Sequence, residues 1–231
     1  IPIHLGSLKG GVTAVLQSYE KDTIKPGDAF ICNDAYLAGG THLPDISIIT
    51  PVLYNNDIKF FTACLGHHSD VGGAVPGSIS PDAMTIFEEG IRIPPIKLVQ
   101  QHIINDDIMK LIIQNTREPN DRLLDLNVQI ATNNLGTARL VDLIEKMGIV
   151  NLNRAIDDLL TYTDQRTRAL ISKLNDGSHS FTTWMDDDGL EGEKLPITAN
   201  VTVDGDQLKL DFTGTGAQSR GAYNVMTTGV M

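Results

Sequence analysis

Two apolar runs separated by Tyr54 and three polar residues place the strongest constraint on the fold. The runs span residues 46–53 and 58–65, and the segment NND, residues 55–57, lies between them. Apolar runs of this length that are joined by so short a polar connection are typical of two antiparallel strands linked by a tight turn. We therefore expect a β-hairpin in the first half of the chain.

The length of the turn decides which residues face each other at the open end of this hairpin. A two-residue turn at Asn55 and Asn56 places Asp45 opposite Gly66, whereas a three-residue loop places Asp45 opposite His67. Directly opposed β-carbons in a sheet are roughly 5 Å apart. With either turn, the entrance of the first strand lies beside the exit of the second.

The segment HLPD, residues 42–45, enters the first strand as a loop. Pro44 disfavours a regular helix there, and a strand would point residues three apart to opposite faces. In a loop, His42, Asp45 and His67 can converge on one divalent metal ion, and two imidazoles with one carboxylate suit zinc, or manganese and iron in a more open shell. Taken singly, each histidine has the alternative of being an ordinary hydrogen-bonding residue.

Three further residues beside these are candidate catalytic residues: His68, Asp70 and Glu89. Adjacent side chains in an extended segment diverge, so we expect His67 to be the ligand and His68 to contact the substrate or a partner subunit. Glu89, or its neighbour Glu88, is a candidate general base. A solvated turn is the alternative for this acidic pair.

Local composition and hydrophobic periodicity divide the chain into three regions and predict an α+β fold. Residues 1–99 are rich in Gly and Pro and predict a mixed β-sheet region with metal-binding loops. Residues 100–177 predict a helical region, and residues 178–231 predict a β-rich region with a hairpin at Asp204-Gly205. We expect the chain to be a portion of one larger catalytic subunit.

Helical periodicity within the middle region predicts four helices. They cover residues 105–114, 121–134, 137–147 and 151–174. The glycine-containing segment GSLKGGVT, residues 6–13, has no GKS or GKT and is predicted to be a loop that leads into a helix.

Composition restricts the compartment and the partners. The formal net charge of −11 and the pI near 4.8 argue against binding to nucleic acid or to anionic membrane surfaces. No apolar run reaches the roughly 18 residues that a membrane helix needs. Cys32 and Cys64 lie in apolar segments and are predicted to be buried, reduced thiols, which favours a cytoplasmic protein.

Several long motifs resemble one family in the same order along essentially all 231 residues. They are GGTHLPDISIITPV, GHHSDVGGAVPGSIS, IFEEGIRIPPIKLV and DFTGTGAQSRGAYN. These motifs resemble the B subunit of N-methylhydantoinase, a module that is also found in 5-oxoprolinase and in acetone carboxylase.

The resemblance implies a metal bound by His42, Asp45 and His67, with zinc in the hydrolases and manganese in acetone carboxylase. It also implies an acidic ligand from a segment upstream of this sequence. A partner A subunit would bind ATP and phosphorylate a small cyclic amide, which this chain would then hydrolyse within a hetero-oligomer. A carboxylase subunit with the same metal site, and a non-catalytic scaffold, are the alternatives.

Overall fold

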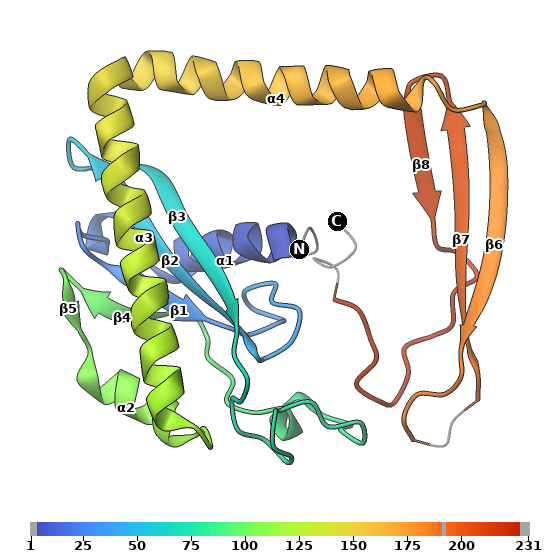
Figure 1. Ribbon diagram of the computed structural model, residues 1–231, viewed down its shortest axis with the longest axis horizontal. Coiled ribbons are helices and arrows are strands. Elements are labelled where there is room, and N and C mark those ends of the chain that lie inside the picture. The colour runs from blue at the N-terminus through green and yellow to red at the C-terminus, as the bar shows by residue number, and fades with distance from the viewer. Residues whose placement is uncertain (1–3, 191–192, 227–231) are drawn as a thin grey trace. The chain divides into compact units, whose positions relative to one another are not determined.

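The computed structural model describes residues 4–190 and 193–226, and the chain forms two compact units (Figure 1). The first unit covers residues up to 142, and the second covers residues 143–224. The boundary falls inside a helix of the predicted helical region, so that region is shared between the two units. The predicted α+β class is confirmed, because both units combine helices with antiparallel sheets.

The first unit is built around a five-stranded sheet in the order β3-β2-β1-β4-β5. All four strand pairs in it are antiparallel, whereas the sequence led us to expect a mixed sheet. The strands are β1 (Ala29–Cys32), β2 (Asp45–Tyr54), β3 (Asp57–His67), β4 (Ile96–Gln100) and β5 (Ile103–Ile104).

Helices cover both faces of this sheet, as the burial of β1 shows. Ala29 and Ile31 pack into a cluster with α2 (Asp106–Gln114) and α3 (Pro119–Met147). The alternate residues Phe30 and Cys32 pack into a second cluster with α1 (His4–Ser18). Because successive side chains of a strand point to opposite faces, β1 is apolar at every position. Two short 3-10 helices, η1 (Lys21–Thr23) and η2 (Ile86–Glu88), lie in the connections.

The glycine-containing segment at residues 6–13 is part of α1, so the loop predicted there is wrong. The helix tolerates these glycines because they allow a close approach to neighbouring segments. A β-carbon at Gly10 would lie 2.7 Å from the carbonyl oxygen of Ala38, and one at Gly11 would lie 2.7 Å from Cδ1 of Ile49.

Residues 119–147 form one continuous helix where the sequence predicted two. The predicted break lies at Gly136, which faces β3: a β-carbon there would lie 3.1 Å from Cγ2 of Thr62. Two buried amides hold α3 to β2, because Gln129 donates to the carbonyl of Ile46 (2.9 Å) and Asn133 to that of Ile48 (2.8 Å). Packing against the sheet therefore outweighs the low helix propensity of glycine.

The second unit holds α4 (Ile149–Ile171) and a three-stranded antiparallel sheet in the order β6-β7-β8. Its strands are β6 (Gly177–Met185), β7 (Leu195–Asp204) and β8 (Gln207–Asp211). The predicted hairpin is confirmed: Asp204 pairs with Gln207, and Gly205 (φ 58°) makes the turn. Within the described part of the chain, none of the helices is long and apolar enough to cross a membrane.

Candidate metal site

The β2–β3 hairpin combines the two alternatives left open by the sequence. Asn55 and Asn56 have positive φ (53° and 63°) and form a two-residue turn. The register then shifts between Val52 and Leu53, where β3 carries one extra residue as a β-bulge. Beyond the bulge the pairing is the one expected of a three-residue loop, and residues 45 and 67 lie directly opposite each other.

The three predicted ligands come together at the open end of this hairpin. His42 Nε2 lies 3.2 Å from Asp45 Oδ2, and His67 Nδ1 lies 3.3 Å from Asp45 Oδ1. The two imidazole rings are stacked, with centroids 5.0 Å apart and planes 5° from parallel. One donor atom from each residue lies within 4.8 Å of the other two, so the predicted convergence is present.

Buried polar contacts hold the loop that carries His42. Asn33 Nδ2 donates to the carbonyl of Leu43 (2.8 Å), and Asn33 Oδ1 accepts from the backbone N–H of Ile93 (2.7 Å). At the other strand end, the backbone N–H of His68 donates to the carbonyl of Pro44 (2.8 Å). The Asn33 bonds anchor the His42 loop, and the bond from His68 to Pro44 joins that loop to the end of β3, which carries His67.

Asp45 is the electrostatic centre of the cluster, and its side chain is only 2% exposed. Burial alone would raise the pKa of this carboxyl group. Hydrogen bonds from His42 and Thr41, together with the nearby imidazoles, outweigh burial and lower the pKa below its ordinary value. Asp45 is thus an anion at neutral pH, which is the form that binds metal ions.

His4 is a neighbour of the cluster that no motif or spacing in the sequence indicates. Its Nδ1 lies 3.6 Å from Asp45 Oδ2. It stands at the start of α1, far from the HLPD and GHH motifs in the sequence, and no spacing rule connects it to them. The signal available was Gly10, which allows α1 to lie close to the backbone of Ala38, just before the loop that carries His42.

Glu89 lies within electrostatic range of His42, whereas the Glu88 carboxylate accepts hydrogen bonds at the start of the 3-10 helix η2. Glu88 accepts from the backbone N–H groups of Met84 and Thr85 (2.9 and 2.8 Å) and from the Thr85 hydroxyl. Glu89 is half-buried, and burial raises its pKa even though His42 acts to lower it. Of the two acidic candidates, Glu89 is the one whose carboxylate caps no helix in the described part of the chain, and its pKa is raised.

His68 points away from the cluster and into the core. Its side chain is 1% exposed, and its Nε2 lies 3.0 Å from Oε1 of Gln129 on α3. Burial lowers its pKa, so the ring is neutral at physiological pH. The divergence of His67 and His68 is as expected, but this burial argues against the direct contact of His68 with a substrate or partner.

Asp70 organises the loop that follows β3. Its carboxylate accepts from the backbone N–H groups of Gly72, Gly77 and Arg117 (2.9, 3.0 and 3.0 Å) and from Nη1 of Arg117 (2.8 Å). The same guanidinium donates to the carbonyls of Gly73 and Val75. With four hydrogen bonds from the protein, Asp70 has the contacts of a residue that shapes the loop.

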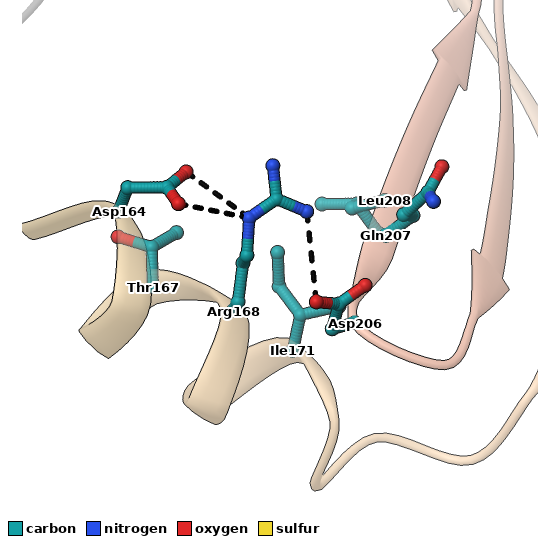
Figure 2. Close-up of a pocket in the computed structure, with 7 residues that line it drawn as sticks. All are labelled: Asp164, Thr167, Arg168, Ile171, Asp206, Gln207 and Leu208. Carbon is teal, nitrogen blue, oxygen red and sulfur yellow. Dashed lines mark hydrogen bonds and ion pairs between the residues drawn. The ribbon is translucent and has the colours of Figure 1, made fainter. Parts of the chain in front are cut away.

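A hollow in the second unit has a different character. Figure 2 shows Arg168 on α4 contacting Asp164 (3.0 Å) and Asp206 of the β7–β8 turn (3.6 Å). All three side chains are about half exposed, so these ion pairs contribute little to stability. The residues that line the hollow include no histidine or cysteine.

The donor set of the cluster suits a divalent cation. Two imidazole nitrogens and one carboxylate oxygen supply three ligands and leave a coordination position open, which is typical of catalytic zinc sites. Manganese accepts the same donors in a larger shell. The chemistry of the residues therefore fits the metal predicted from the sequence.

Comparison with known proteins gives a consistent result. Residues 1–231 match the family model for hydantoinase B/oxoprolinase. The chain is 37% identical over 208 residues to caprolactamase subunit beta of Pseudomonas jessenii, which is 90% of this chain and 35% of that protein. It is 31% identical over 247 residues to 5-oxoprolinase 1 of Arabidopsis thaliana, which is 97% of this chain and 19% of that protein.

A solved structure shows the same fold. The crystal structure of ATP-dependent caprolactamase from Pseudomonas jessenii matches with a TM-score of 0.90 and 34% identity. The match covers 99% of this chain and 39% of that chain. The chain thus spans well under half the length of the relatives that it matches.

Proposed function

Because the chain belongs to the hydantoinase B/oxoprolinase family, we propose that it is the metal-dependent hydrolytic subunit of an ATP-coupled cyclic amide hydrolase. The observation that carries this proposal is the convergence of His42, Asp45 and His67 at the open end of one hairpin. The substrate class would be a small ring amide such as a hydantoin, 5-oxoproline or a lactam.

The reaction would be divided between two proteins. A cyclic amide is stabilised by resonance, and phosphorylation of its oxygen by an ATP-binding A-type subunit would create a good leaving group. This chain carries no GKS or GKT phosphate-binding loop in its sequence, which is consistent with ATP binding by the partner. A divalent cation, when bound, supplies Lewis-acid chemistry that makes water reactive near neutral pH.

The residues around the cation would each have a distinct task. His42, Asp45 and His67 would hold the ion, with zinc preferred over manganese for this donor set. Glu89 would take the proton from the attacking water, because it is half-buried, lies within electrostatic range of His42, and has a pKa that burial raises. His68 would support the site from the core through its contact with Gln129.

The compartment and assembly follow from the same reasoning. Cys32 and Cys64 are both free thiols, which fits a reducing environment, and we propose a cytoplasmic location. Division of the chemistry between two proteins requires that they meet, so we propose a hetero-oligomer with the A-type subunit.

Elemental analysis of the purified chain tests the metal site. We expect close to one equivalent of zinc or manganese in the wild type and in the control His179→Ala, whose histidine lies on the exposed strand β6. His67→Ala should lose most of the metal because it removes one of three ligands. Equal metal content in wild type and His67→Ala would refute the site.

An assay with the A-type partner tests the reaction. We expect Glu89→Gln to retain its metal and to lower turnover of a cyclic amide with ATP by roughly 10²–10⁴-fold, the usual contribution of a general base. Consumption of ATP together with bicarbonate, and not of the cyclic amide, would instead support the carboxylase alternative. An intact complex with no turnover of either substrate would support the scaffold alternative.

A further inference from the structure

We propose that His4 is a positioning residue of this site: it holds the Asp45 carboxylate through Nδ1–H and so strengthens metal binding. The inference rests on the proposed metal site and adds a residue to it that none of the sequence motifs for the ligands contains. It concerns the partner of a ligand and leaves the set of three ligands unchanged.

The first observation is an unsatisfied buried nitrogen. The His4 side chain is 24% exposed as a whole, but its Nδ1 is buried and has no hydrogen-bond partner among residues 4–190 and 193–226. Leaving a buried polar atom unpaired is unfavourable, so a donor in this position favours an arrangement that gives it an acceptor. The nearest acidic group is Asp45 Oδ2 at 3.6 Å, which is slightly too far for a hydrogen bond.

The second observation concerns what Asp45 would lose when a cation is bound. In the structure its oxygens lie against His42 Nε2 (3.2 Å), His67 Nδ1 (3.3 Å) and the Thr41 hydroxyl. Imidazoles that bind a metal direct a lone pair at it, so they no longer donate to the carboxylate. The carboxylate oxygen that is not on the cation then needs other donors, and Thr41 and His4 are the groups already beside it.

The third observation separates this role from direct ligation. Among the described residues, the group whose donor atoms lie within 4.8 Å of one another contains His42, Asp45 and His67 and does not contain His4. His4 approaches the shared carboxylate from its Oδ2 side. Hydrogen bonds to ligating groups orient them and raise their affinity for the metal.

The fold provides a reason for this placement. His4 is the first residue of α1, and Gly10 allows that helix to lie against the backbone of Ala38, just before the loop that carries the ligands. A β-carbon at Gly10 would lie 2.7 Å from the Ala38 carbonyl oxygen. The close packing of α1 therefore sets the position of His4 relative to Asp45.

Metal affinity and a cobalt spectrum together test the proposal. We would compare wild type, His4→Leu, His4→Asn and the control His179→Leu by zinc competition with a chromophoric chelator, and record d–d bands of each after loading with Co²⁺. We expect His4→Leu to bind zinc 10–100-fold more weakly, the usual effect of removing such a partner, with cobalt bands at unchanged positions. His4→Asn should recover most of the affinity, because its amide N–H stands close to the place of Nδ1–H.

Each other result has a definite meaning. Equal zinc affinity in His4→Leu and wild type overturns the role of His4 and leaves the metal site standing. A changed cobalt spectrum in His4→Leu would make His4 a ligand and also overturns the positioning role. A wild type that binds neither ion refutes the proposed function itself. If His4→Leu does not fold, as judged by circular dichroism, the comparison of His4→Asn with His4→Ala decides between the same outcomes.

Discussion

Asp45 and Asp70 are buried carboxylates in the same unit, yet their partners differ in kind. Asp45 is surrounded by imidazoles and one hydroxyl, groups that can turn toward a cation. Asp70 is bound by three backbone N–H groups and by the guanidinium of Arg117, which also donates to carbonyls of the same loop. The partners of a buried acid therefore distinguish a candidate ligand from a structural residue.

Replacement of Asp70 by Asn should destabilise the chain in a pH-dependent way. Burial alone would raise the pKa of Asp70, but the hydrogen bonds from Arg117, Gly72 and Gly77 lower it from 3.8 to about 2. The carboxylate therefore contributes about 2 kcal/mol of stability above pH 4, which is lost as the pH falls toward 2. Urea unfolding of wild type and Asp70→Asn at several pH values measures this difference.

The control and the contradicting result are clear for this variant. Asp57→Asn changes an exposed carboxylate that pairs with the neighbouring Lys59 and should alter the free energy of unfolding by under about 1 kcal/mol. A difference between Asp70→Asn and wild type that stays constant from pH 7 to pH 2 would show that the pKa of Asp70 is not lowered.

The two cysteines should be slow to react with thiol reagents in the native protein. Burial, assisted by Asp34, raises the pKa of Cys32 to about 12, and burial raises that of Cys64. The thiolate is the reactive form, so both should label slowly, Cys64 faster because it is less buried. Timed labelling before and after denaturation should give two thiols only in the unfolded chain. Rapid native labelling of Cys32 would contradict its burial.

At the scale of single residues, the sequence was sufficient where chemistry and short-range geometry coincide. His42, Asp45 and His67 could be brought together because one hairpin joins their loops. His4 could not, because its proximity depends on how a helix packs on the sheet, which the local sequence does not encode. The core-facing orientation of His68 depends in the same way on α3.

Gly10→Ala is the variant that tests helix packing at the scale of elements. In an exposed helix this change stabilises by about 1 kcal/mol. Here the added β-carbon would lie 2.7 Å from a backbone oxygen of Ala38, which cannot move freely, and we expect a net loss of roughly 1–3 kcal/mol. Thermal or urea unfolding beside Lys9→Ala, an exposed position on the same helix, provides the measurement.

A stabilised Gly10→Ala would mean that α1 is not held against that loop. The position of His4 would then need a different explanation, because it depends on the same packing. A variant that is destabilised and also binds metal more weakly would connect the two observations.

Element types were predictable from periodicity, whereas their lengths and registers depended on contacts. The helices at residues 105–114 and 151–174 were found close to their observed bounds. The break predicted near Gly136 was wrong, because that glycine lies within a continuous helix and allows the helix to pack closely against Thr62. The hairpin register required a bulge that the composition of the strand does not indicate.

At the scale of the molecule, the three regions distinguished by composition and periodicity do not coincide with the two compact units. The helical region is divided at residue 142, because α3 begins on the first sheet and its end belongs with α4. Periodicity is a local signal, but a compact unit is defined by contacts between distant segments. The boundary could therefore not be derived from composition.

Trp184, the only tryptophan in the sequence, reports on the second unit. It lies on β6 and is 57% exposed, and Phe181 of the same strand is exposed as well. We expect the chain alone to show an emission maximum near that of free tryptophan and efficient quenching by acrylamide. An emission maximum typical of a buried indole would contradict this exposure and would indicate self-association through that sheet.

The bulge in β3 has an implication for how the length of this chain can change. Because β3 carries one extra residue, deletion of a residue at the bulge would leave a regular β2–β3 hairpin. The residues at positions 45 and 67 would still pair at its open end. An added residue would need a second irregularity to keep that pairing, because a slip of one position turns side chains to the opposite face. Deletion of one residue from β3 should therefore be better tolerated than insertion of one residue.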